Sequence, residues 1–175
     1  MKKILFLLFI SASLISIAQT QFQQEAVGFM AFTKGRIAQL AEAMPEDKYS
    51  WAPSDDVRSF SSVIGHVVST NYFLGMKLGG TPPEGLNPMT IEKELTTKVA
   101  LTEALDKSHE FITAAINNLE EVEMGDKVEM PFPGDFTKMG IVNIAMNHAS
   151  EHMGQMIAYA RGNGITPPWS VASSE

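Results

Sequence analysis

Four long segments with apolar residues at spacings of three and four constrain the fold most strongly. They cover residues 21–43, 59–78, 91–119 and 138–161, and connections rich in Pro and Gly separate them. This spacing places an apolar stripe along one side of a helix, and the stripe must be buried against another element. No segment shows the strong alternation that is typical of a strand. The sequence therefore predicts an all-α fold, a four-helix bundle, with longer connections after the second and third helices.

The two longer connections are less regular. The third segment is expected to be one helix over 91–119, or a helix whose early part is a separate turn. Residues 120–137 contain two Pro and two Gly residues, which exclude a regular helix. A short extended pair is expected there, around 127–132.

Charge and Cys content exclude several classes of function. The 175-residue chain has 13 Lys+Arg against 20 Asp+Glu, a formal net charge of −7, and no basic run. Because nucleic-acid affinity depends on Lys and Arg that neutralise phosphates, this balance argues against DNA, RNA and anionic lipid as partners. The chain has no Cys. Disulfides, thiolate ligands and a Cys nucleophile are therefore excluded, and any metal must be held by His, Asp or Glu.

The N-terminus has the pattern of a secretory signal peptide. Lys2 and Lys3 precede an apolar run over residues 4–17, and Ser16 and Ala18 place small residues where a signal peptidase cuts. A membrane anchor is the alternative, but the run is shorter than the ~20 apolar residues that span a bilayer. We expect a signal peptide at 1–18 and one domain at 19–175. The predicted location is the bacterial periplasm or the medium, with no membrane attachment after cleavage.

Three of the four His residues form the candidate metal site. His148 and His152 are four apart, so on a helix both imidazoles lie on one face and can reach one ion. This face also carries apolar residues and is expected to point into the bundle. His66 lies on the inward face of the second helix and could approach the pair. Three His ligands leave a position open, as in catalytic metal sites. Imidazole ligands suit several divalent ions, and zinc or nickel is expected.

Less specific interpretations compete with this one. An inward His is often a hydrogen-bonded core residue, and the three imidazoles could be purely structural. His109 lies among charged residues and is expected to be solvated and not to bind metal. Residues 148–152 also match the H-x-x-E-H pattern of some zinc proteases. Such proteases need a further ligand well downstream, and only 23 residues follow His152, so this match is weak.

Other residues near the pair are candidates for secondary roles. Glu151 is either a surface charge or a base beside the ion. Gln155 and Tyr159 could steady an imidazole or carry a proton. Trp51 and Trp169 could line the mouth of the site and contact substrate, although packing is the alternative for each.

Several motifs of this chain resemble those of the DinB-like superfamily. Residues 148–155 read HASEHMGQ, and YAR at 159–161 and GITPP at 164–168 follow. Upstream, WAP at 51–53 precedes RSF at 58–60 and IGH at 64–66. Together these motifs resemble the turn, second-helix and last-helix signatures of the superfamily over most of the predicted domain.

This resemblance implies an up-down-down-up four-helix bundle in which His66, His148 and His152 form a metal-binding triad. Members with known activities include bacillithiol-type thiol S-transferases and a mycothiol-dependent maleylpyruvate isomerase, in which a divalent metal activates the thiol. The chain departs from the family in two ways. Members often carry His at the position of Glu151, and most are cytoplasmic.

The sequence thus predicts an exported protein that binds one divalent metal ion. A metal-dependent hydrolase or a thiol or group transferase acting on a small-molecule substrate is the leading hypothesis. The alternative is a non-catalytic module of the same fold that binds a metal, a ligand or a partner. A homodimer is also expected, because apolar strips on bundle helices often pair protomers.

Overall fold

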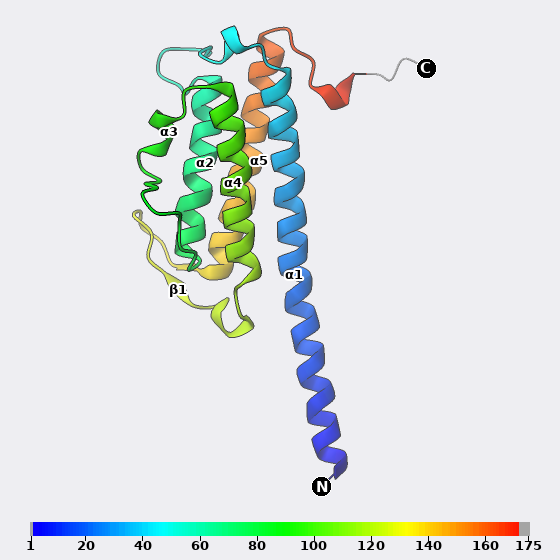
Figure 1. Cartoon of the computed structure of the whole chain (residues 1–175). Helices are drawn as coiled ribbons and strands as arrows, with labels where there is room; N and C mark the ends of the chain where they lie inside the picture. The colour runs from blue at the N-terminus through cyan, green and yellow to red at the C-terminus, as the bar shows by residue number, and fades with distance from the viewer. Residues whose placement is uncertain (1, 172–175) are drawn as a thin grey trace.

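The computed structural model is a helical bundle with one small hairpin (Figure 1). It describes residues 2–171, and the side chains of residues 21–171. The α-helices are α1 (Lys2–Ala43), α2 (Phe60–Lys77), α3 (Ile91–Glu94), α4 (Lys98–Asn117) and α5 (Lys138–Gly162). The strands are β1 (Lys127–Val128) and β2 (Phe136–Thr137), and three short 3-10 turns lie at Glu46–Lys48, Glu121–Glu123 and Pro168–Ser170.

The four long helices run up, down, down and up in the order α1, α2, α4 and α5 (Figure 1). Helix α2 packs against α4 and α5, and α1 packs against the same two helices. The predicted all-α four-helix bundle is confirmed. The long connections after α2 and α4 are confirmed as well. The first is required because two successive downward helices oblige the chain to return along the bundle, and the second contains the hairpin.

Side-chain caps determine where three of the helices begin. Ser59 accepts a hydrogen bond from the Ser62 N–H at the start of α2, and Thr137 does the same for the Gly140 N–H of α5. Thr97 caps α4 in the same way. This cap separates α3 from α4, so the third segment is not one helix over 91–119. The alternative prediction, a separate early turn, is confirmed, since a cap requires an extended residue before the helix.

The extended pair forms, but its second strand lies beyond the range predicted around 127–132. Lys127 pairs with Thr137, and Val128 pairs with Phe136, in an antiparallel arrangement. Residues 129–135 form the connection between them and contain two Pro residues, which cannot donate ladder hydrogen bonds. The second strand therefore begins only after these prolines.

Two apolar clusters fill the bundle along its length. One contains Phe60, Leu105 and Met156, and the other contains Ile112 and Ala145. On α5, the residues between 145 and 156 therefore lie where one cluster gives way to the other. The predicted His pair falls in this interval.

Nothing in the structure bears on the predicted signal peptide at 1–18, which lies outside the residues whose side chains are described. Among the helices searched within the described residues, none is long and apolar enough to cross a membrane.

The expectation that His109 is solvated is wrong. Its Nε2 atom is buried and has no hydrogen-bond partner within the described residues. Burial lowers the pKa of His109, the nearby Lys34 lowers it further, and a hydrogen bond to the Met30 backbone raises it in part. The helical periodicity of α4 did place His109 at the edge of the apolar stripe, but only the packing of α1 covers it.

His109 should make stability depend on pH. Its pKa is lower in the folded protein than the ordinary value of 6.5, so the unfolded state binds more protons below pH 6.5. The contribution to stability is fully present above pH 6.5 and is lost as the pH falls toward the folded-state pKa. Urea unfolding in EDTA should show a smaller loss of stability between pH 7 and 5 for His109→Gln than for the wild type. Equal losses would contradict this account.

Candidate metal centre

Three imidazoles from two helices meet between α2 and α5. The Nε2 atom of His148 lies 3.0 Å from Nε2 of His66 and 3.1 Å from Nε2 of His152. One nitrogen from each residue can be chosen so that all three lie within 4.8 Å of one another, and no other such group of His and carboxylate side chains occurs among the described residues. The spacing of four on α5 and the inward face of α2 therefore bring together the three residues that the sequence singled out.

A chain of hydrogen bonds determines which nitrogen of His152 carries the proton. The Arg58 carbonyl can only accept, so the Tyr159 hydroxyl donates to it at 3.0 Å. The Tyr159 oxygen accepts from the Gln155 amide nitrogen at 2.8 Å. The Gln155 carbonyl oxygen then faces Nδ1 of His152 at 2.8 Å, and Nδ1 must be the donor. Neutral His152 therefore presents an unprotonated Nε2 to the other two imidazoles.

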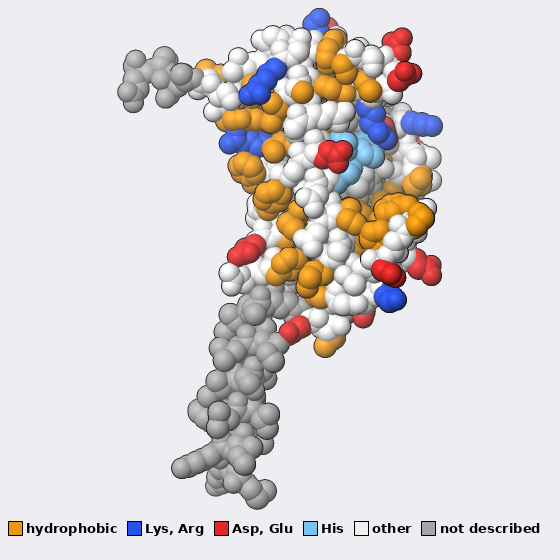
Figure 2. Space-filling view, turned by 180° about the vertical axis from the view of Figure 1, so that it is seen from behind, with side chains coloured by type: hydrophobic (Ala, Val, Ile, Leu, Met, Phe, Trp, Pro, Cys, Tyr) orange, Lys and Arg blue, Asp and Glu red, His pale blue; other side chains and the backbone are white. Residues whose placement is uncertain are grey.

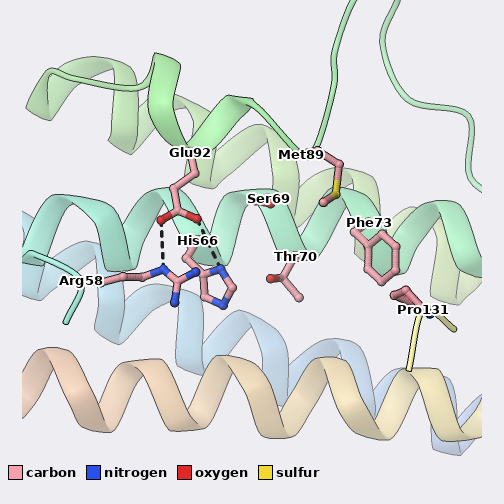
Figure 3. A pocket seen from close by; sticks show the side chains of 8 residues that line it. All are labelled: Arg58, His66, Ser69, Thr70, Phe73, Met89, Glu92 and Pro131. Carbon is pink, nitrogen blue, oxygen red and sulfur yellow. Dashed lines mark hydrogen bonds and ion pairs between the residues drawn. The ribbon is translucent and has the colours of Figure 1, made fainter. Parts of the chain in front are cut away.

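A carboxylate lies behind His66 in a similar position. Glu92, on the short helix α3, places Oε2 at 3.6 Å from Nδ1 of His66 and accepts a hydrogen bond at 2.9 Å from Nε of Arg58 (Figure 3). A contact of 3.6 Å is electrostatic and not a hydrogen bond. A Cβ at Gly65 would lie 3.3 Å from the backbone and side chain of Glu92. Gly at this position therefore lets α3 approach α2 closely and bring Glu92 beside His66.

The surroundings favour the neutral form of His66 and His148. His152 is buried, with 8% of its surface exposed, and His66 and His148 are half-buried. Burial lowers the pKa of His148 to about 3, and the neighbouring His152, His66 and Arg58 act in the same direction. Burial also lowers the pKa of His66, followed by Arg58 and His152, while Glu92 opposes this shift. Neutral imidazole is the form that binds a metal.

The donor set fits a divalent metal ion better than a hydrogen-bonded core. In the absence of metal, the His148 Nε2 contacts both other Nε2 atoms, and one shared proton can satisfy only one of these contacts. Every neutral arrangement thus leaves one contact unsatisfied, with two lone pairs or two N–H groups facing each other, which is unfavourable at a partly buried position. Imidazoles bound to one ion at about 2.0–2.1 Å lie about 2.9–3.4 Å apart, for right-angle to tetrahedral geometry. The two separations that involve His148, 3.0 and 3.1 Å, agree with this range, and all three nitrogens lie within 4.8 Å of one another.

Comparisons with known proteins agree with the fold and the motifs. The sequence profile of the DinB superfamily matches residues 31–156. The chain belongs to the DinB superfamily. A comparison of the chain with curated proteins found no match.

Solved structures show the same fold. A DinB-like protein, YjoA of Bacillus subtilis, is similar with a TM-score of 0.63 and 21% identity, covering 81% of this chain and 93% of that one. A conserved protein of Enterococcus faecalis is similar with a TM-score of 0.61 and 15% identity, covering 79% and 94%. At these identities the likeness concerns the fold. The superfamily membership and the DinB-like bundle that the motifs predicted are both confirmed.

The remaining candidate residues of this DinB-superfamily chain fall in different places. Gln155 and Tyr159 form the hydrogen-bond chain behind His152, and the Trp51 ring packs edge-on against Tyr159 at 5.3 Å. Trp169 lies away from this group, over the Arg36 guanidinium of α1 at 4.1 Å. Glu151 is exposed. Proton transfer by Glu151 and substrate contact by the two Trp residues stay predictions.

Arg58 and Glu92 are the site residues that the sequence reasoning did not assign. Arg58 supplies both the carbonyl that ends the Tyr159 chain and the guanidinium that binds Glu92. It stands directly before the Ser59 cap in the RSF motif, which could have indicated it. Glu92 had no such signal, because the path of the connection between α2 and α4 does not follow from periodicity.

Removing the hydrogen-bond partner of His152 should weaken metal binding without unfolding the bundle. We expect Gln155→Leu to lower zinc affinity about 10- to 100-fold, because the imidazole loses the acceptor that fixes its tautomer. Competition with a chelating dye measures the affinity. Asn147→Leu is the matched control, since Asn147 is an exposed amide on the same helix that bonds only to the Asn143 carbonyl. Equal affinities for the two variants would contradict the role of Gln155.

Proposed function

We propose that this protein is a metal-dependent enzyme that binds one divalent ion, zinc or nickel, through His66, His148 and His152. The observation that supports this most directly is the convergence of three imidazoles, with Nε2 of His148 at 3.0 and 3.1 Å from the Nε2 atoms of His66 and His152. The superfamily match and the His group that could hold a metal point the same way. The proposed reaction is hydrolysis, or transfer of a thiol or another group, on a small-molecule substrate.

Each residue of the site has a physical role in this proposal. A divalent ion supplies Lewis-acid chemistry that polarises a carbonyl or favours ionisation of water or a thiol. The three imidazoles hold the ion and, being neutral, leave its charge undiminished. Gln155 and Tyr159 keep the His152 proton on Nδ1, and Tyr159 is held in turn by the Arg58 carbonyl. Glu92 offsets the positive charge near His66 and orients that ring.

Access from solvent favours turnover over a closed structural site. His66 and His148 are only half-buried, and His side chains are visible on the surface of the bundle beside charged groups (Figure 2). Three protein ligands from this group also leave room for a further ligand at the ion, as catalytic metal sites require. A site that only stabilised the fold would be expected to have four protein ligands.

Metal content tests the proposal. Protein purified without an affinity tag should contain about one equivalent of zinc or nickel per chain, because three neutral imidazoles and open coordination suit these ions. His66→Ala and His152→Ala should each lose most of it. Elemental analysis after incubation with zinc and nickel, followed by desalting, is the measurement. A wild type without metal would overturn the proposal.

Turnover separates an enzyme from a binding module of the same fold. The metal-loaded protein should act on at least one member of a panel of esters, amides and electrophiles supplied with thiols. His148→Ala should lose that activity by about 10²-fold or more, because the ion that polarises the substrate is lost. Stoichiometric metal binding without turnover of any class would favour the alternative, a non-catalytic metal- or ligand-binding module.

We further propose that the protein is exported to the periplasm or the medium after removal of residues 1–18. The charged start and short apolar run of this segment support the proposal. Edman sequencing of the protein recovered outside the cytoplasm should read from Gln19 onward. A chain that retains Lys2 and Lys3 and sediments with membranes would contradict cleavage and favour an anchor. A homodimer stays a prediction.

A further inference from the structure

A cavity of about 290 Å³ opens beside the His group and runs along α2. Its walls come from α2, from the connection that carries Met89 and Glu92, and from the hairpin connection that carries Pro131 (Figure 3). His66 belongs to both the His group and this cavity. A molecule bound at the proposed ion could therefore extend into the cavity without a change in the fold.

The two ends of the cavity differ in chemistry. Arg58, His66 and Glu92 lie at one end, and Phe73, Met89 and Pro131 lie at the other (Figure 3). The Arg58 hydrogen bond to Glu92 uses Nε, one of three guanidinium nitrogens, so donors remain for an oxygen-bearing group. The far end offers apolar side chains from three different segments, and Ser69 and Thr70 lie between the two ends. Such a cavity matches a molecule with a polar head and an apolar tail.

Side chains of α2 hold both outer walls in place. The Ser69 hydroxyl donates to the Pro88 carbonyl at 2.6 Å, directly before Met89. The Lys77 ammonium donates to the Glu129 carbonyl at 2.6 Å, two residues before Pro131. The apolar end is therefore anchored to the same helix that carries His66, and a ligand would meet a largely preformed site.

We propose that the substrate is an acyl compound, with its carbonyl head at the His66 and Arg58 end and an unbranched apolar tail along Phe73, Met89 and Pro131. This inference rests on the proposed metal-dependent function and specifies its substrate class. From residue 66 to residue 73, α2 rises about 10 Å, which sets the length of tail that the cavity covers. With zigzag C–C bonds of about 1.5 Å, this corresponds to roughly eight carbons.

Straight-chain alkyl hydroxamates test this assignment by binding, without any need for turnover. Their acyl head binds divalent metals, and the tail can be lengthened one methylene at a time. We expect the affinity of the zinc-loaded protein to rise about threefold per methylene, because each group is removed from water. From acetohydroxamate to octanohydroxamate the gain should reach about 100-fold or more, and longer chains should add little. Isothermal titration calorimetry measures it.

Two surface variants locate the tail. Met89→Glu places a carboxylate at the apolar end, and Met89 is 78% exposed, so the fold tolerates the change. Val99→Glu is the matched control, since Val99 is 67% exposed and is not part of the cavity wall. Met89→Glu should reduce the gain between the two hydroxamates to less than about tenfold, whereas Val99→Glu should leave it unchanged. Val99→Glu should also bind acetohydroxamate as the wild type does.

The outcomes distinguish this proposal from the proposed function. One zinc per chain with an affinity independent of tail length would overturn the acyl-tail assignment and leave the metal site standing. The acyl-tail assignment would also be overturned if Met89→Glu kept the full gain in affinity with tail length. It would likewise be overturned if Met89→Glu weakened the binding of both hydroxamates equally. A protein that binds no zinc would overturn the metal-dependent function and this substrate class with it.

Discussion

The mutual approach of three imidazole nitrogens is the constraint on which the rest of the site depends. His148 presents its Nε2 atom to the Nε2 atoms of His66 and His152 at 3.0 and 3.1 Å, where the bundle partly excludes water. One shared proton cannot satisfy two such contacts, and protonation of buried neighbouring imidazoles is opposed by desolvation and by their charges. A divalent cation would remove the conflict, because it can accept all three lone pairs. The bundle thus holds, between α2 and α5, a cluster of three imidazoles that is unfavourable without a ligand.

The surrounding structure keeps those lone pairs directed at one point. A main-chain carbonyl that can only accept, that of Arg58, sets the direction of every hydrogen bond through Tyr159 and Gln155 to Nδ1 of His152. The Arg58 side chain binds Glu92, which lies behind His66. One residue at the entry to α2 therefore connects the partners of two imidazoles from different helices. Changes at Arg58 should therefore affect both His66 and His152, although Arg58 is connected to each of them only through other residues.

The features that could be predicted from the sequence are those that depend on helical periodicity. The spacing of His148 and His152 placed both on one face of α5, and the apolar stripe of α2 turned His66 toward them. The caps at Ser59 and Thr137 follow from the chemistry of short polar side chains. Glu92, the strand partner of Lys127 and the burial of His109 depend instead on how connections and neighbouring helices pack. Such contacts join positions far apart in sequence, and no local pattern specifies them.

X-ray absorption at the zinc edge of the zinc-loaded protein tests the central claim most directly. It reports the atoms bound to the ion whatever reaction the protein catalyses. The account predicts about three imidazole nitrogens at about 2.0–2.1 Å, with the remaining scatterers being oxygen from solvent or buffer. His148→Ala should lose most of the bound zinc, and any zinc that it retains should show one imidazole fewer. A shell made up of oxygen alone, or one unchanged by His148→Ala, would contradict the proposed metal centre.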